Sequence, residues 1–153
     1  MAGPYQEARA RRYGLAMIRH ARVDDVPALM RIRAAVRENV LSDPARVPPS
    51  LVEEFIARSG IWLWQDDAGV LGFAAADTRD GSIWALFVDP AHEGRGIARA
   101  LLPRALDDLR AAGWRQATLS TEPGSRADRF YRRQGWIAGD LTRRGERLFS
   151  LDL

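Results

Sequence analysis

Apolar residues recur along the chain with two periods, and these predict alternating strands and helices. Alternating or continuous apolar runs rich in β-branched and aromatic residues are typical of strands, whereas apolar residues every three or four positions are typical of amphipathic helices. We expect strands at about 15–20, 60–65, 69–78, 82–88, 116–120, 136–140 and 147–151. We expect helices at about 26–40, 51–58, 98–112 and 126–134. This order predicts a domain of the α/β class.

Polar and glycine-containing segments mark the ends of these elements. The segments 66–69 and 79–81 predict tight turns between neighbouring strands. One of the two aspartates at 24–25 is expected to cap the first long helix. Ser50, with Glu53 three residues later, predicts a capping box at the start of the second.

A glycine loop between a strand and a helix predicts an anion-binding site. The apolar run at 83–88 breaks at Asp89 and Pro90, and Gly94 and Gly96 follow shortly before the helix. The first N–H groups of a helix have no acceptor inside the helix and carry a partial positive charge, so phosphate oxygens bind well there. Glycines also allow the backbone to approach such a group closely.

Other phosphate-binding loops fit this segment less well. A Walker A loop requires a lysine, and all 23 basic residues of this chain are arginine. A Rossmann loop requires a third glycine for close packing of helix on strand, and Arg99 occupies that position. An ordinary strand-to-helix connection with a glycine turn remains the alternative.

The segment from Glu93 to Ala98 resembles the acetyl-CoA site of the GNAT N-acetyltransferase superfamily, whose signature is Gln/Arg-x-x-Gly-x-Gly/Ala. Glu93 stands where the family usually has Gln or Arg, and we expect its side chain to face solvent or to pair with Arg95. The resemblance covers about residues 17–151 and implies a single-domain GNAT-type fold, α/β, with a mixed, mostly antiparallel sheet flanked by helices on both faces. It implies acetyl-CoA as the acyl donor and these cofactor-binding residues: Phe87, Val88, Glu93, Gly94, Arg95, Gly96, Ile97, Ala98, Arg99 and Thr121.

The same resemblance implies a sheet that opens beside the cofactor. The strands that end near Val88 and Ser120 would splay apart, so that unpaired backbone groups of Phe87 and Val88 bind the pantetheine arm. The tetrahedral oxyanion would form near the Val88 N–H.

A second motif, Arg129-Phe-Tyr-Arg-Arg-Gln-Gly-Trp136, is similar to the C-terminal motif of the family. Gly135 is expected to end the helix in a left-handed conformation, which places Tyr131 one turn before the end. The resemblance implies that Tyr131 donates a proton to the departing thiolate. The alternative is a half-buried tyrosine that anchors the helix. Gly124 stands where many relatives have asparagine, and Thr121 or Ser125 would replace that contact.

The base that removes a proton from the amine has several candidates. Asp89 ends a strand but is expected to cap the turn at Pro90. His92 has a suitable ordinary pKa and lies at the edge of the loop. Glu122 and Glu38 are further candidates, and a water chain is an equal alternative.

Aromatic and charged residues mark a possible acceptor pocket. Trp62 and Trp64 share a face of one strand, and Trp84 lies on the strand that leads to the cofactor site. Core packing is the alternative for each, and Trp84 is the preferred substrate residue. In the family, the connection after the first helix shapes this pocket, so Arg37 and Glu38 are also candidate substrate residues. Solvated charges at a helix end are the alternative for these two.

Composition limits the remaining classes of protein. We expect one domain at 15–153 and a disordered basic leader at 1–14. There is no cysteine, and no apolar run approaches the roughly 20 residues that span a bilayer, so we expect a cytoplasmic protein without membrane contact and with no metal. The net charge of +3 comes from scattered arginines, which does not favour nucleic-acid binding.

The leading hypothesis is therefore an N-acetyltransferase that moves an acetyl group from acetyl-CoA to a primary amine by direct attack in a ternary complex. The acceptor would be a small molecule or a peptide, and a homodimer is common among similar proteins. The alternative is a non-catalytic acyl-CoA-binding sensor or interaction module on the same fold. A nucleic-acid-binding module ranks third.

Overall fold

A seven-stranded sheet organises the chain in the computed structural model, which describes residues 16–36 and 47–153. The expected leader at 1–14 and the candidates Arg37 and Glu38 lie outside the described residues. The strands are β1 Met17–His20, β2 Trp62–Asp66, β3 Gly69–Asp77, β4 Ser82–Val88, β5 Gln116–Thr121, β6 Ile137–Leu141 and β7 Arg147–Asp152. The helices are α2 Val26–Ala35, α3 Pro49–Arg58, α4 Ile97–Ala111 and α5 Arg126–Arg133, with short 3-10 turns η1 Val23–Asp25 and η4 Pro90–His92.

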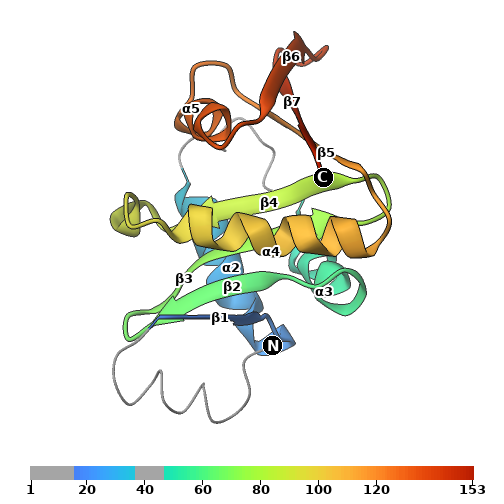
Figure 1. The fold of residues 1–153 in the computed structure, drawn as a ribbon. Coiled ribbons are helices and arrows are strands. Elements are labelled where there is room, and N and C mark those ends of the chain that lie inside the picture. The colour runs from blue at the N-terminus through green and yellow to red at the C-terminus, as the bar shows by residue number, and fades with distance from the viewer. Residues whose placement is uncertain (1–15, 37–46) are drawn as a thin grey trace.

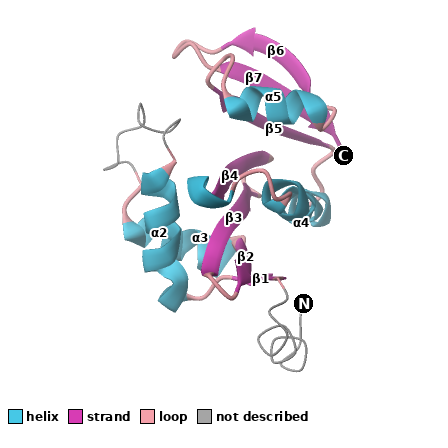
Figure 2. Ribbon diagram, turned by 90° about the vertical axis from the view of Figure 1, so that its left-hand side faces the viewer, coloured by secondary structure: helices cyan, strands magenta, loops and turns pink. Residues whose placement is uncertain are grey.

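The sheet is mixed and mostly antiparallel, in the order β1-β2-β3-β4-β5-β7-β6. Every neighbouring pair is antiparallel except β4 and β5. Helices cover both faces, with α2 and α3 on one side and α4 on the other, while α5 lies against β5 and β7 (Figure 1, Figure 2). The expected α/β class and sheet type are confirmed.

Two apolar clusters form the core, one on each face of the sheet. The first packs under α4 and α5 and includes Leu101, Leu109 and Phe149, all fully buried. The second packs under α2 and α3 and includes Ile32 and Phe55, which are also fully buried. Burial of this apolar surface is the main force that fixes the helices on the sheet.

The sheet opens between β4 and β5. These parallel strands pair only at Ser82 with Thr118, next to the start of β4, so they separate toward their carboxyl ends. Figure 2 shows β5, β7, β6 and α5 standing apart from β4. One edge of β4 is therefore without a strand partner beyond this pair.

Hydrogen-bond alternation decides which groups of β4 face the opening. The Asp89 N–H donates to the Leu71 carbonyl at 2.8 Å. Because alternate residues of a strand bond to the same neighbour, the backbone groups of Phe87 face β3, while those of Leu86 and Val88 face the opening. Phe87 was also expected to present unpaired backbone groups, but by this alternation its backbone belongs to the β3 ladder. Both Phe87 and Val88 line the cavity described below.

Helix ends differ from the sequence expectation at three places. Helix α2 ends at Ala35 rather than near residue 40, and Val36 is extended. Helix α3 begins at Pro49 without a side-chain cap, so the capping box at Ser50 is absent; proline suits the first turn because its φ is already helical. Asp25 accepts the Arg22 N–H at 2.7 Å and pairs with Arg19, and therefore caps η1 instead of α2.

Candidate active site

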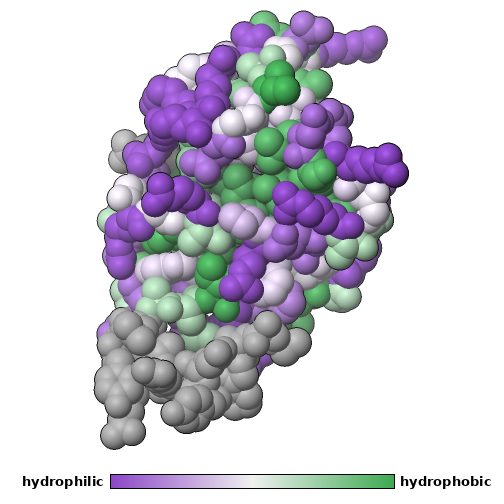
Figure 3. Space-filling model, in the orientation of Figure 1, coloured by the Kyte–Doolittle hydropathy of each residue, from purple (hydrophilic) through white to green (hydrophobic). Residues whose placement is uncertain are grey.

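A cavity of about 1130 Å³ passes through the opening of the sheet. Leu86, Val88 and Tyr131 line it from the side of the α4 cluster. Trp84 and Phe87 line it from the side of the α2 cluster. On the surface in Figure 3, hydrophobic residues gather in the middle of the face and hydrophilic residues border them. One cavity thus gives two ligands access from opposite faces of the sheet.

Free backbone amides lie at one end of the cavity. Gly94 and Gly96 have positive φ angles of 78° and 79°, and both line the cavity together with Ile97, Ala98 and Arg99. The first helical bond of α4 is donated by Ala100 to the Gly96 carbonyl. Within the part of the chain that the structure describes, the amides of residues 94–99 donate to no protein acceptor. This geometry suits a pyrophosphate.

Open space above the loop supports this interpretation. A Cβ added at Gly94 would have no heavy atom within 4 Å, and one added at Gly96 would meet only the Arg99 guanidinium, at 4.0 Å. The glycines are therefore required by their backbone angles and not by crowding from protein. The space leaves room for a ligand.

Glu93 pairs with a residue that the sequence did not suggest. Glu93 is exposed, as one of the two expectations had it, but its carboxylate contacts Arg126 at the start of α5, at 2.7 Å, and not Arg95. Arg95 is held by Asp66 at 3.2 Å and by Nδ1 of His92 at 3.1 Å, and its side chain is not part of the cavity lining. The pairing with Arg126 neutralises the carboxylate that lies beside the anion loop.

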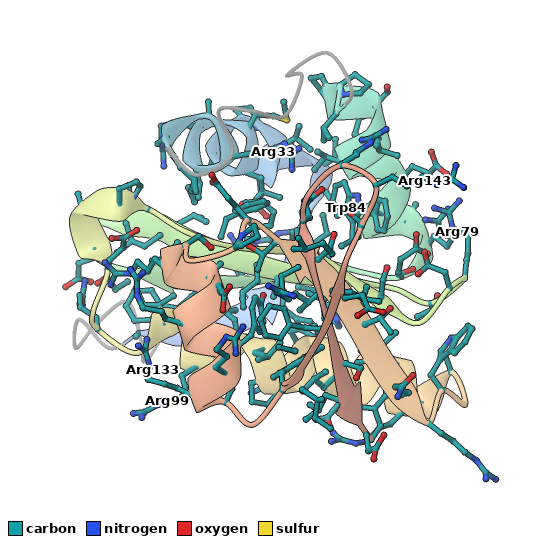
Figure 4. All side chains as sticks on the ribbon, turned by 90° about the horizontal axis from the view of Figure 1, so that it is seen from above. Arg33, Arg79, Trp84, Arg99, Arg133 and Arg143 are labelled. Atoms are coloured by element: carbon teal, nitrogen blue, oxygen red, sulfur yellow. The ribbon has the colours of Figure 1, made fainter. Side chains whose placement is uncertain are left out.

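Two exposed arginines lie at the loop end of the cavity. Arg99 projects from α4 and Arg133 from α5, and both line the cavity. Figure 4 shows them together, away from Arg33 and Trp84. Cations near the free amides would bind additional phosphate groups of a ligand. Arg133 was missed in the sequence because its direction depends on how α5 packs.

Tyr131 lies buried where α5 meets the cavity. Its ring packs edge-on against Phe130 and Trp136 and tilted against Phe149. Burial raises the pKa of the phenol well above its ordinary value, so the group stays protonated at neutral pH. A protonated phenol that lines the cavity can donate a proton there.

The end of α5 fixes the position of this tyrosine. Gly135 has a φ of 86°, and its N–H donates to the Arg132 carbonyl. The Trp136 N–H donates to the Tyr131 carbonyl at 3.0 Å. These two bonds form a Schellman motif, as the sequence predicted from Gly135.

The start of α5 is held by a buried aspartate. Asp128 accepts the Gly124 N–H at 2.9 Å and the Arg132 Nε–H at 2.6 Å. Its own N–H donates to Oγ of Ser125 at 3.1 Å, and Ser125 lies 3.5 Å from the Thr121 hydroxyl. Thr121 lines the cavity, so these contacts connect the cavity wall to the start of α5.

Asp128 gives the first testable prediction. The Arg132 guanidinium, and after it the Gly124 amide, hold the pKa of Asp128 below its usual value. The carboxylate therefore stabilises the fold above the unfolded-chain pKa of 3.8, and this contribution is lost as the pH falls further. At pH 7, Asp128→Asn is expected to lower the free energy of unfolding by about 2 kcal/mol, measured in urea. Asp107→Asn, on an exposed ion pair, is the control and should change it little.

The candidate bases fall into separate places. The carboxylate of Asp89 accepts the Ala91 N–H at 3.0 Å and is absent from the cavity lining, as its capping role predicted. His92 and Glu122 both line the cavity. Glu146, missed in the sequence, lines it as well and accepts a bond from Ser120 at 3.3 Å. In the sequence, Glu146 is a carboxylate just before the last strand, and nothing there distinguishes it from a solvated turn residue.

The three tryptophans differ in their roles. The Trp62 indole donates to Asp108 at 2.8 Å, and Trp64 lies under the Arg95 guanidinium at 5.3 Å, so both have packing partners outside the cavity. Trp84 lines the cavity and stacks on Phe55 with 3.8 Å between ring centroids. It occupies a β-bulge, unpaired between Ile83 and Ala85 in the register with β3. Of the three tryptophans, Trp84, the substrate residue preferred from the sequence, is the one that lines the cavity.

The described residues contain no group of three or more His, Cys, Asp or Glu side chains placed to hold a metal ion. In the same residues, none of the helices is both long enough and apolar enough to cross a membrane.

Comparison with known proteins agrees with the geometry. Residues 27–136 match the acetyltransferase (GNAT) family. Mycothiol acetyltransferase from Beutenbergia cavernae is 37% identical over 90 residues, which is 55% of this chain and 30% of that protein. The chain therefore spans less than a third of this relative.

Solved structures share the fold at lower identity. PaiA N-acetyltransferase from Thermoplasma acidophilum, in complex with coenzyme A, has a TM-score of 0.76 and 14% identity, covering 90% of this chain and 99% of that one. YncA from Salmonella typhimurium, solved with acetyl-CoA, has a TM-score of 0.71 and 21% identity, covering 90% and 94%.

The open sheet and the free amides at the start of α4 form a site that suits a phosphate-bearing ligand. The chain belongs to the acetyltransferase (GNAT) family. The family assignment made from its two sequence motifs is confirmed.

Proposed function

We propose that this protein transfers an acetyl group from acetyl-CoA to a primary amine by direct attack in a ternary complex. The observation that carries the proposal is the single cavity that joins the free amides of residues 94–99 to the phenol of Tyr131 through the sheet opening. The similarity to a mycothiol acetyltransferase supports acetyl transfer as the reaction. Acetyl-CoA supplies the activated acyl group as a thioester.

The residues at the donor side would bind and orient the thioester. The loop amides, with Arg99 and Arg133, bind the phosphates. The N–H and C=O groups of Leu86 and Val88 at the open edge of β4 bind the pantetheine arm as a neighbouring strand would. The Val88 N–H also faces the opening, where it can stabilise an oxyanion.

Proton transfers would use groups on both sides of the opening. A free alkylamine is protonated at pH 7, so a proton must leave the nitrogen before attack on the carbonyl carbon. Glu146 and Glu122 line the cavity and can take this proton, directly or through water, whereas the third lining carboxylate, Glu93, is paired with Arg126. The Tyr131 phenol returns a proton to sulfur as the C–S bond breaks.

Two measurements test the proposal. Calorimetry with CoA is expected to give saturable binding with one site per chain. A thiol-release assay with acetyl-CoA and a panel of primary amines is expected to give turnover above buffer hydrolysis with at least one amine. Absence of CoA binding would refute every acyl-CoA function. CoA binding without thiol release on any amine would instead favour a non-catalytic acyl-CoA sensor.

A further inference from the structure

The cavity has a second charged end on the α2 side of the sheet. Arg33 of α2 and Trp84 of β4 line it there, together with the turn between β6 and β7 at residues 144–146. Figure 4 shows Arg33 and Trp84 on the side of the molecule away from Arg99 and Arg133. The phosphate-binding loop and this end are thus separate parts of one cavity.

Arg33 is half-buried and lies over an aromatic ring. Its guanidinium carbon is 5.5 Å from the centroid of Phe87, and burial lowers its pKa from the ordinary arginine value. Among the described residues, no carboxylate forms an ion pair with Arg33, whereas seven other arginines have acidic partners. A partly desolvated guanidinium without a counter-charge is costly, and an anion brought by a ligand would relieve that cost.

Glu146 adds a negative group to the same cavity. It lies in the turn immediately before β7 and lines the cavity. This end of the cavity, where the acceptor would bind, therefore offers the half-buried cation of Arg33, the exposed Arg144 of the turn and the carboxylate of Glu146. A ligand with an ammonium group and a carboxylate complements both signs of charge.

We propose that the acceptor is an amino acid whose carboxylate binds Arg33 and whose amine points toward Glu146 and the sheet opening. This inference rests on the proposed function and names the substrate class of the same site. The planar fork of arginine binds a carboxylate with two parallel hydrogen bonds, and the Phe87 face holds the fork in place. A phosphate dianion would meet more repulsion from Glu146 than a carboxylate does.

Matched acceptors test this inference. Leucine and phenylalanine are compared with isoamylamine and phenethylamine, which lack only the carboxylate, and with phosphoethanolamine. For the wild-type protein, kcat/KM is expected to be at least about 10-fold higher for each amino acid than for its matched amine. Arg33→Gln is expected to lower the amino-acid value about 30-fold and to change the amine value less than about 3-fold. Arg33→Lys is expected to recover part of the loss.

Arg31→Gln is the matched control, because Arg31 lies on the same helix, is exposed and makes only a 3.4 Å bond to the Val70 carbonyl. This variant should leave kcat/KM unchanged for both amino acids and simple amines. Calorimetry should show the same CoA affinity for the wild-type protein and for all three variants. Equal losses on amino acids and amines, or a wild-type preference for the simple amine or the phosphoamine, would overturn the inference.

Direct binding separates this inference from the proposed function. If CoA binds but no amine is acetylated, leucine and isoamylamine are titrated into the CoA-saturated protein and into its Arg33→Gln variant. Leucine binding that is at least about 10-fold weaker in the variant supports the carboxylate site even without turnover. Binding that does not depend on Arg33 refutes it.

Discussion

Replacing Tyr131 with phenylalanine is expected to lower kcat for thiol release about 100-fold and to leave CoA affinity nearly unchanged. The phenol is the protonated donor that lines the cavity, while the ring supplies the packing against Trp136 and Phe149. Phenylalanine keeps the ring and removes only the hydroxyl group. Steady-state kinetics give kcat, and calorimetry gives the dissociation constant for CoA.

The pH profile provides a second measurement of the same group. Because burial raises the pKa of Tyr131 above its ordinary value of 10.0, the wild-type enzyme should show no loss of kcat from phenol ionisation between pH 7 and 10. An unchanged kcat in the phenylalanine variant would show that the hydroxyl of Tyr131 is not the proton donor. Tyr131 would then only anchor helix α5, a role that its burial also fits. A fall in melting temperature with weaker CoA binding would point to the same conclusion.

Replacing Gly72 with alanine is expected to destabilise the fold by about 2 kcal/mol and to weaken CoA binding. Gly72 lies on β3 beneath the start of α4, and an added Cβ would lie 2.8 Å from Cγ2 of Ile97 and 3.1 Å from the Phe87 carbonyl oxygen. Ile97 is a stiff, buried β-branched residue next to the phosphate-binding amides. Moving it must move the loop. Urea unfolding and CoA calorimetry measure the two effects.

Gly139→Ala is the matched control for this change. Gly139 is also a strand glycine without a positive φ, and an added Cβ would meet its nearest heavy atom, the Leu148 carbonyl oxygen, at 3.5 Å. That is an ordinary contact, so stability and CoA affinity should both be retained. Equal stability and equal CoA affinity of Gly72→Ala and Gly139→Ala would show that the position of α4 does not depend on its close contact with Gly72.

Local signals in the sequence predict most of the fold. A continuous apolar run between two turn segments places β4 at Ser82–Val88 without error, and the other strands are placed within about two residues. The positive φ angles at Gly94, Gly96 and Gly135 follow from glycine at positions where a loop or helix end demands them. Helix starts are less predictable, because Pro48 and Pro49 replace the side-chain cap that Ser50 offers.

The site could be predicted only where its residues lie close in sequence. The loop at 93–99 and the motif around Tyr131 each form within one segment. The contact of Glu93 with Arg126 joins residues far apart in the chain, and depends on α5 closing over the loop. Arg33 and Glu146 are also far apart in the chain, and they line the same cavity only after the sheet has formed. Such pairings depend on tertiary packing, which no local pattern encodes.

The opening between β4 and β5 has a consequence for inhibitor design. In the proposed function the donor and the acceptor approach from opposite sides and meet only there, so one molecule that links the sulfur of CoA to the nitrogen of an amino acid is expected to fill both halves at once. Joining the two pieces removes the entropy cost of binding the second. The linker must be narrow, because it has to thread between two strands of a single sheet.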